Sequence, residues 1–293
     1  QERSEAGVEL NTLLQYKPYS TARTEKRALY AGLLTGLTQF HRERCPEYGR
    51  LLDALGCPAH MDCTVESTPM LPVSLFKELE LRSIPEGEVF KTITSSGTTG
   101  QRVSRIFLDG ATSACQQQAL CQIMSDFLGE RRLPFLVLDS RQVLRNRAMF
   151  SARGAGILGF SIFGTRPCYA LDEHMELDLD GVRAFLEEHQ GETIFLFGFT
   201  FIIWKHVVRA LEERGERLDI PNGILVHGGG WKKLAGEAVS PGEFKARVAA
   251  ATGVERVSNY YGMAEQTGCI YMECPQGHLH ASLWSDIVVR RGR

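Results

Sequence analysis

The sequence predicts an α/β protein with mostly parallel sheets flanked by helices. Short apolar runs of β type alternate along the chain with stretches whose apolar residues recur every three or four positions, and this alternation is typical of parallel sheets. The composition agrees, because hydrophobic residues make up 43% and charged residues 23% of the 293 residues. These fractions are ordinary for a globular protein and exclude global disorder.

The predicted elements begin with a helix over residues 24–55. Leu29, Leu33, Leu37 and Phe40 recur at three- and four-residue spacings, which place them on one helical face. A short helix at 74–81 follows a proline-punctuated connector. After it, β-type runs at 91–94, 103–108, 134–138, 193–198, 223–227 and 255–261 alternate with helical stretches at 111–128, 179–189, 201–214 and 241–251.

Length and element order predict the domain organisation. At roughly 100–200 residues per domain, the chain is expected to hold one large domain or two small ones. We expect residues 1–70 to form an N-terminal helical segment packed on the main α/β domain, which would span 71–293.

Charge and hydrophobicity exclude several classes of partner. Lys plus Arg number 33 against 35 Asp plus Glu, for a net charge of −2, so nucleic-acid binding and a polybasic membrane anchor are not expected. The uncharged run at 193–204 is shorter than the roughly 20 residues of a spanning helix, and no secretory signal is visible. The 8 cysteines are scattered, which indicates reduced thiols in a cytoplasmic protein.

A polar, glycine-rich loop follows the predicted strand at 91–94, and ligands of parallel α/β sheets bind in such loops. Residues 95–100 (SSGTTG) combine hydroxyls with two glycines. Successive backbone N–H groups and hydroxyls could hold a phosphate, although the spacing is not that of a Walker loop. The alternative is a Ser/Gly hairpin turn between two strands.

A second loop, residues 227–233 (HGGGWKK), follows the apolar run GILV. Three glycines after a buried strand indicate a backbone that lies close to a flat ligand or leaves the strand sharply. Lys232 and Lys233 could reach a phosphate or carboxylate. The alternative is a flexible glycine loop with two solvated lysines.

The third loop, residues 259–268 (NYYGMAEQTG), ends a predicted strand with an aromatic pair. Tyr260 or Tyr261 could stack on a base, and Glu265 is a hard oxygen ligand of the type that Mg²⁺ prefers beside phosphates. The alternative is an aromatic plug of the core with an exposed glutamate.

Together and in this order, the three loops resemble those of the adenylate-forming (acyl- and aryl-AMP) synthetases. SSGTTG is similar to their phosphate loop, GGGW to their adenine-binding loop, and YYGMAE to their YGxTE motif. The sequence more closely resembles the acyl-protein synthetase (LuxE) family, through LPVSLFKELELRSIPEGEVFKTITSSGTTGQ, SRIFLD, HGGGWKKL and NYYGMAEQTG. The resemblance implies the large N-terminal domain of an adenylate-forming enzyme.

The resemblance implies an enzyme that uses ATP and Mg²⁺ to activate a long-chain fatty acid, or another carboxylic acid, as an acyl-adenylate. The acyl group would then move to a protein cysteine for a reductase partner. Glu265 would bind the metal, and Glu265, Thr98 and Lys232 would contribute to catalysis. The nucleotide-binding residues implied are Ser95, Ser96, Gly97, Thr98, Thr99, Gly100, His227, Gly228, Gly229, Gly230, Asn259, Tyr260, Tyr261, Gly262, Met263 and Ala264.

The sequence departs from the family pattern at three points. Ala264 stands where a threonine is usual, and no lysine follows the phosphate loop, so Arg102 or Arg105 would have to substitute. The chain ends in a strand-like run at 284–291, with no motif of the small C-terminal domain. That domain, and the acceptor cysteine that the resemblance places near the family's C-terminus, are expected to be absent from this chain.

The acid needs an apolar slot, and the run at 194–204 is the most apolar of the chain. Phe195 and Phe197 are better explained as a buried central strand, whereas residues 199–203 and the glycine-rich stretch at 154–163 are candidates for the pocket.

Other functions stay open at this point. One is an acyl- or aryl-CoA ligase of the phenylacetate-CoA ligase type, and another is a binding homologue without catalysis. Zinc could be held by Cys57, His60 and Cys63, or by Cys269, Cys274, His278 and His280, although ordinary buried thiols and a strand pair are the simpler explanations.

Overall fold

The computed structural model describes residues 12–95, 102–144, 152–266 and 268–290. By their contacts the residues form two compact units. The first comprises residues 1–126, 262–270 and 281–293, and the second comprises 127–261 and 271–280. The predicted boundary after residue 70 falls inside the first unit, and as a statement about domains it remains a prediction.

The first unit is mainly helical. Helices α2 (Arg23–Arg44) and α3 (Pro46–Ala54) stand where one long helix was predicted. The helix is interrupted at Cys45 because Pro46 lacks the N–H that would continue the hydrogen bonds of α2. Proline is instead favourable at the first position of a helix, which is its place in α3. The short α4 (Leu75–Glu78) and 3₁₀ turn η1 (Glu86–Glu88) lead into the antiparallel pair β1 (Lys91–Thr94) and β2 (Arg105–Leu108).

A buried lysine holds the first unit together. The ammonium of Lys26 on α2 donates to the carbonyl oxygen of Ser282 at 2.8 Å and also to that of Ser285, and the hydroxyl of Tyr30 donates to the Leu283 carbonyl at 2.6 Å. These bonds fasten residues 282–285 to α2, across more than 250 positions of sequence. The strand expected at 284–291 is absent from its described part, residues 284–290, where the carbonyl of Ser285 accepts from Lys26 of α2.

Helix α5 (Gly110–Leu128) runs across the boundary between the units, and the second unit is an α/β layer structure. Its sheet has the strand order β4-β3-β5-β6-β7-β8-β9. The pairs from β4 through β7 are parallel, and those of β8 and β9 are antiparallel. The strands are β3 (Leu133–Ser140), β4 (Gly164–Leu171), β5 (Ile194–Phe199), β6 (Gly223–Gly228), β7 (Arg256–Tyr261), β8 (Tyr271–Glu273) and β9 (Leu279–His280).

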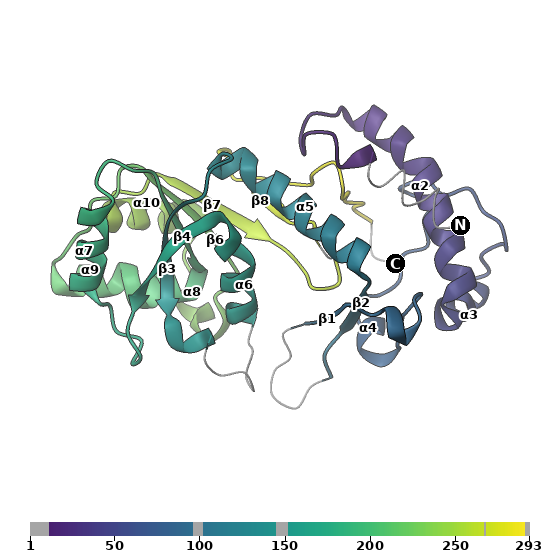
Figure 1. The fold of residues 1–293 in the computed structure, drawn as a ribbon, viewed down its shortest axis with the longest axis horizontal. Helices are drawn as coiled ribbons and strands as arrows, with labels where there is room; N and C mark the ends of the chain where they lie inside the picture. The colour runs from purple at the N-terminus through teal and green to yellow at the C-terminus, as the bar shows by residue number, and fades with distance from the viewer. Residues whose placement is uncertain (1–11, 96–101, 145–151, 267, 291–293) are drawn as a thin grey trace. The chain divides into compact units, whose positions relative to one another are not determined.

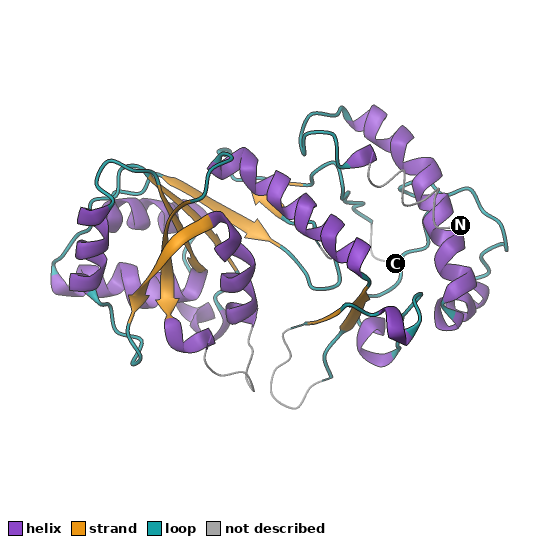
Figure 2. Cartoon of the chain, in the orientation of Figure 1, coloured by secondary structure: helices purple, strands orange, loops and turns teal. Residues whose placement is uncertain are grey.

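Helices cover both faces of this sheet (Figures 1 and 2). A Cβ on Gly156 of α6 would lie 2.9 Å from Phe199, whereas one on Gly198 would lie 3.1 Å from Ile203. Since neighbouring residues of β5 point to opposite faces, α6 covers one face and the helical run from Thr200 covers the other. The helical elements are η2 (Arg141–Leu144), α6 (Ala152–Phe160), η4 (Ser161–Phe163), α7 (Leu179–Glu188), α8 (Thr200–Ile202), the π-helical η5 (Ile203–Val208), α9 (Arg209–Arg214), η6 (Lys232–Glu237) and α10 (Pro241–Thr252).

The core of the second unit lies along the central strands. Phe195 and Phe197 are fully buried, and the rings of Phe135 and Phe195 stack at 4.9 Å between centroids. This confirms the interpretation of both residues as parts of a buried central strand. Strand β4 was missed because its sequence, GTRPCYAL, carries a proline and few apolar residues. Helix α6 was missed because its three glycines lower the helical signal.

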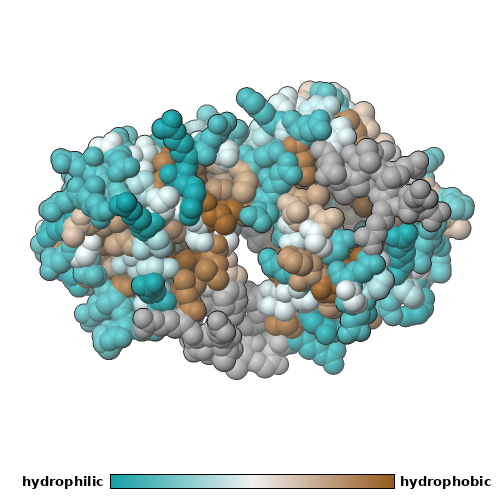
Figure 3. All heavy atoms as spheres, in the orientation of Figure 1, coloured by the Kyte–Doolittle hydropathy of each residue, from teal (hydrophilic) through white to brown (hydrophobic). Residues whose placement is uncertain are grey.

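Hydrophilic and hydrophobic side chains are interspersed on the face shown in Figure 3. Among the described residues, no helix is both long enough and apolar enough to cross a bilayer.

Candidate functional site at the ends of three parallel strands

The ends of β5, β6 and β7 lie side by side in the sheet. Gly228, the last residue of β6, pairs with Phe199 at the end of β5 and with Tyr260 near the end of β7. Because the carboxyl ends of parallel strands meet at one edge, the HGGGW loop and the YYG turn leave the sheet next to each other. This is the edge at which ligands of open α/β sheets bind.

Gly228 lies directly beneath the ring of Tyr260. A Cβ at Gly228 would be 2.5 Å from Cε1 of that ring, which is closer than any side chain tolerates. Gly229 follows with a φ of +79°, a conformation that favours glycine. These two positions therefore require glycine for different reasons, one for close packing and one for the turn.

Tyr260 and Tyr261 point to opposite faces of the sheet, and only one of them is open. The ring of Tyr260 packs against Phe160 at 5.0 Å and Phe197 at 6.1 Å between centroids, and burial raises its pKa to about 12. It is the aromatic plug that the sequence left as an alternative. Tyr261 is 48% exposed, and its ring lies 6.0 Å from Tyr271, so it is the tyrosine that can offer a face to a planar ligand.

His227 is buried beside the glycine loop. Its Nδ1 lies 2.9 Å from the hydroxyl of Thr200, and that hydroxyl donates to the carbonyl of Gly228 at 3.2 Å. Burial, with a smaller contribution from the positive charge of Lys245, lowers the pKa of His227 to about 3. The imidazole is therefore neutral at physiological pH.

Aromatic side chains surround His227 on the α10 side of the sheet. Its ring lies 4.6 Å from that of Phe244, and Phe244 also contacts Trp204 and Trp231. Trp231 comes from the glycine loop, so this contact anchors the loop to α10. No local sequence pattern indicated this cluster, because its members come from β6, η5, α10 and the loop between β6 and η6.

A buried glutamate holds the backbone of β7 at Asn259. The carboxylate of Glu273 on β8 accepts a hydrogen bond from the backbone N–H of Asn259 at 2.8 Å. It also forms an ion pair with the ammonium of Lys245 at 2.9 Å. Asn259 is the register partner of His227, so their side chains share a face. Among the described residues, neither Oδ1 of Asn259 nor Nε2 of His227 has a hydrogen-bond partner, although both atoms are buried. Glu273 escaped the sequence analysis because its partners are distant in sequence.

The first unit carries the other predicted loops. Residues 96–100, which include Ser96, Gly97, Thr98, Thr99 and Gly100, lie outside the described residues. Ser95 begins the hairpin, where its hydroxyl accepts from the Ser104 N–H at 2.9 Å. Gly262, Met263, Ala264 and Glu265 continue from Tyr261 in a turn, with Glu265 partly buried.

The cations that were considered as substitutes for the missing lysine have carboxylate partners. Arg102 donates to Glu78 at 2.6 Å, and Arg105 lies 3.6 Å from Glu80. The backbone of Lys232 opens η6, while its side chain lies outside the description. The two arginine–glutamate ion pairs are solvent-exposed and therefore weak, so they do not hold either arginine side chain in one position.

The cysteines have no partner sulfur, and the described residues hold no group that could bind a metal. Neither zinc alternative therefore gains support among those residues. Cys274, His278 and His280 instead lie in and beside the antiparallel pair of β8 and β9. Burial raises the pKa of Cys168 and of Cys269 to about 11, which makes both thiols poor nucleophiles at neutral pH.

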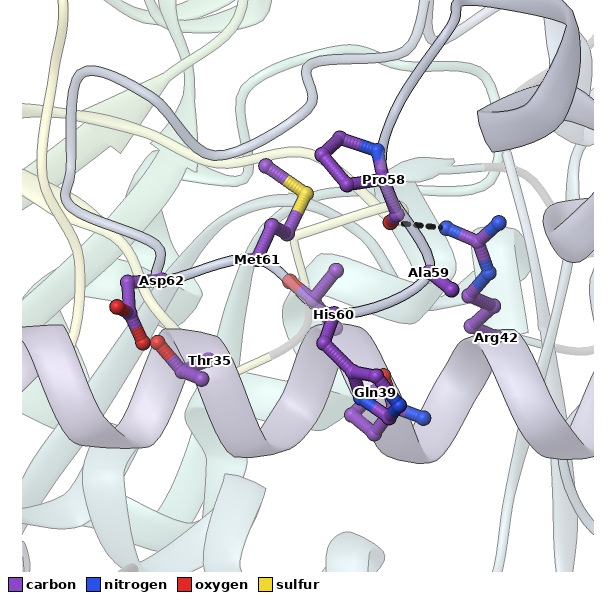
Figure 4. Close-up of a pocket in the computed structure, with 9 residues that line it drawn as sticks. Thr35, Gln39, Arg42, Pro58, Ala59, His60, Met61 and Asp62 are labelled. Carbon is purple, nitrogen blue, oxygen red and sulfur yellow. Dashed lines mark hydrogen bonds between the residues drawn. The ribbon is translucent and has the colours of Figure 1, made fainter.

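A cavity of about 210 Å³ lies away from these motifs, between α2 and residues 58–62 (Figure 4). The guanidinium of Arg42 on its wall donates to the Pro58 carbonyl at 2.7 Å and pairs with Asp53. No residue of the three loops lines it, so it has no place in the candidate site.

Comparison with known proteins adds the family. The sequence model of the acyl-protein synthetase (LuxE) family matches residues 4–292. The chain belongs to this family. A curated relative, the long-chain-fatty-acid–luciferin-component ligase of Vibrio harveyi, is 22% identical over 251 residues. That match covers 83% of this chain and 64% of the relative, so the chain spans less than two thirds of the length of this relative.

Solved structures of 2-hydroxyisobutyryl-CoA ligase share the fold of this family member. One, in an open conformation with 2-HIB-AMP and CoA, has a TM-score of 0.58 at 16% identity and covers 94% of this chain and 66% of its own. Another, in the thioesterification state, has a TM-score of 0.60 at 18% identity, with coverage of 91% and 55%. These comparisons confirm the predicted fold class of an adenylate-forming ligase.

We predict that Gly228→Ala destabilises the protein, because the added methyl group collides with the ring of Tyr260. Overpacking of this kind should lower the free energy of unfolding by about 1–3 kcal/mol. Gly230→Ala is the matched control, since a Cβ there meets nothing within 4 Å. Chemical denaturation of both variants measures the difference, and equal stabilities would contradict the packing.

We predict that His227 makes stability depend on pH. Its folded pKa of about 3 lies below the unfolded value of about 6.5, so between these values the unfolded state binds the extra proton. Stability is therefore full above the unfolded pKa and falls as the pH drops through this window. His227→Phe should flatten the slope by up to about 1.4 kcal/mol per pH unit. Denaturation at pH 7 and pH 4.5 tests this, and parallel losses in parent and variant would refute it.

Proposed function

We propose that this protein activates a carboxylic acid with ATP as an acyl-adenylate and serves the transfer of the acyl group to a thiol. The register of Phe199, Gly228 and Tyr260 carries the proposal, because it brings two of the three loops to one edge of a parallel sheet. Membership of the acyl-protein synthetase family and the fold of a ligase support the same chemistry.

The geometry of this edge fits an adenine. Tyr261 offers an exposed ring for stacking, and the exposed Gly229 and Gly230, which follow Gly228 in the loop, let the backbone approach a planar ligand. The buried Oδ1 of Asn259 is an acceptor without a partner among the described residues, which suits the amino group of the base. We assign these residues, with Gly230, to nucleotide binding.

The phosphates would be held by the loop at 95–100 and the metal by the turn that follows Tyr261. In this proposal Ser95, Ser96, Gly97, Thr98, Thr99 and Gly100 supply backbone N–H groups and hydroxyls, and Lys232 adds a positive charge. Glu265 would hold Mg²⁺, and its carboxylate is the donor type that this ion prefers. Gly262, Met263 and Ala264 place that carboxylate four residues after Tyr261.

The residues would act by neutralising and aligning two anions. Adenylation joins a carboxylate oxygen to the α-phosphorus of ATP while the bond to pyrophosphate breaks, and no protein nucleophile is needed. Fixed N–H groups would stabilise the developing charge without reorganisation, and Mg²⁺ held by Glu265 would supply further positive charge beside the phosphates. The Ala264 position supplies no hydroxyl, so the backbone and residues 95–100 carry more of this task.

The aliphatic chain of the acid is best placed beside Phe199. The ring of Phe199 lies between α6 and the glycine loop, since a Cβ at Gly156 or at Gly229 would lie 2.9 or 3.0 Å from it. Residues 199–203 are largely buried, so in this conformation they form packed core. Phe199 and Phe160 are buried as well, so we propose that the α6 side of Phe199, with Phe160, becomes the wall that contacts the acid when the packing against α6 opens.

The partners and compartment follow from the same proposal. A long-chain fatty acid is the expected substrate, and a reductase is the expected recipient of the acyl group. Free cysteines throughout the described chain suit a reducing, cytoplasmic location. Pyrophosphate exchange with a panel of fatty and aromatic acids tests the reaction, and added CoA tests whether the acceptor is a small thiol instead. Absence of acid-dependent exchange would refute the proposal.

We predict that Glu265→Ala lowers Mg²⁺-dependent acyl-adenylate formation by at least about a hundredfold, because the site loses its only assigned metal ligand. Glu255→Ala, at an exposed position before β7, is the control and should keep parental activity. Adenylate yield across a magnesium titration is the measurement. Equal yields from Glu265→Ala and the parent would remove Glu265 from the mechanism.

We predict that none of the cysteines of this chain becomes acylated when ATP and a labelled fatty acid are supplied. An acceptor thiol must be exposed and able to ionise, whereas Cys45 and Cys63 are buried and Cys269 has its pKa raised to about 11. Hydroxylamine-sensitive label should be absent, and acyl-adenylate should be released slowly or not at all. Label on Cys269 or Cys274 would overturn this prediction.

A further inference from the structure

A chain of hydrogen bonds joins the end of β5 to the end of β6. Thr200 follows the last residue of β5 and is buried. Its Oγ1 lies 2.9 Å from Nδ1 of His227 and donates to the carbonyl oxygen of Gly228 at 3.2 Å. This series of hydrogen bonds therefore ends on Gly228, the residue from which the glycine loop leaves the sheet.

The donor and acceptor of each hydrogen bond follow from the single proton of the Thr200 hydroxyl. A hydroxyl carries one proton, and Thr200 gives it to the carbonyl of Gly228. Its oxygen must then accept from His227, so Nδ1 of the imidazole carries the hydrogen. In the opposite tautomer, with the hydrogen on Nε2, Thr200 would have to donate its proton to Nδ1, and its hydrogen bond to the Gly228 carbonyl would be lost. This tautomer would also leave a buried Nε2–H donor that finds no acceptor among the described residues.

The surroundings of His227 leave little room for direct contact with a ligand. The residue is 5% exposed, and its ring faces Phe244 at 4.6 Å. Gly229 and Gly230, in contrast, are exposed. The residues that can meet a nucleotide are those of the loop, and the hydrogen bond of the His227 imidazole reaches them through Thr200.

We propose that Thr200 and His227 form a relay that orients the carbonyl of Gly228 and so preorganises the glycine loop for ATP. This inference rests on the proposed function, and it corrects one part of the sequence prediction. His227 is a positioning residue here, not a nucleotide contact. The relay lowers the cost of ordering the loop when the nucleotide binds, and it acts on the affinity for ATP rather than on the site of the acid.

Two substitutions at Thr200, one that removes the hydroxyl and one that keeps it, provide the test. Thr200→Val keeps the shape and removes the hydroxyl, and we expect it to weaken ATP binding by about threefold to tenfold, the range of one buried neutral hydrogen bond. Thr200→Ser retains the hydroxyl and should restore parental affinity. Calorimetry with ATP and the KM for the acid are measured in parallel, and the acid KM should stay unchanged. Equal ATP affinity in the valine and serine variants would overturn the proposal.

A double-mutant cycle separates the relay from direct contact. If His227 acts only through Thr200, adding His227→Phe to Thr200→Val should not weaken ATP binding further. A further loss of threefold or more would show that the imidazole itself meets the nucleotide, which contradicts the proposal. Thermal melting of each variant confirms folding, and the Thr200 pair decides the question where the phenylalanine variant does not fold.

Nuclear magnetic resonance tests the relay without nucleotide. Long-range ¹H–¹⁵N spectra distinguish protonated from bare ring nitrogens, and we expect a hydrogen on Nδ1 of His227 and none on Nε2. The opposite tautomer in the parent protein would overturn the relay. A parent that binds no ATP but shows the expected tautomer would refute the proposed function and the nucleotide role, while leaving the hydrogen bonds as described.

Discussion

The contact between Gly228 and the ring of Tyr260 is the constraint on which the candidate site depends. A glycine at the end of β6 lets an aromatic side chain from β7 lie across the strand, and that ring in turn packs against Phe160 on α6 and Phe197 on β5. Three strands and one helix are thereby locked at the same level of the sheet. The loops that leave these strands start from fixed positions, which a shared ligand requires.

The two faces of the sheet take different parts in this arrangement. On the α6 face, stacked rings make an apolar layer that continues into the core. On the α10 face, polar groups alternate with aromatic ones, and a buried carboxylate, Glu273, holds the backbone of β7 at Asn259. The proposed function would place both an aliphatic acid and a nucleotide at this site, and such a division suits both, because a buried polar group without a partner is expensive on an apolar face.

Burial sets the chemistry of the titratable groups near the site. His227 is kept neutral and Tyr260 is kept protonated because charge is unfavourable inside the aromatic layers. Neither residue therefore changes its charge near neutral pH. Adenylation needs no proton transfer by a protein group in its first step, so a site built from oriented dipoles and an assigned carboxylate is consistent with the reaction proposed.

The fold class, the positions of most strands along the chain and the loops where polar residues and glycines gather could all be predicted from the sequence. Its signals there are local: strand and helix periods differ, and glycines and hydroxyls cluster after apolar runs such as GILV. The folded chain was needed to show which tyrosine is open, because Tyr260 and Tyr261 are the same residue type and differ in the face of the sheet to which they point. It also decided the partners of Thr200, Glu273 and Lys26, since hydrogen bonds between residues far apart in sequence leave no trace in local periodicity.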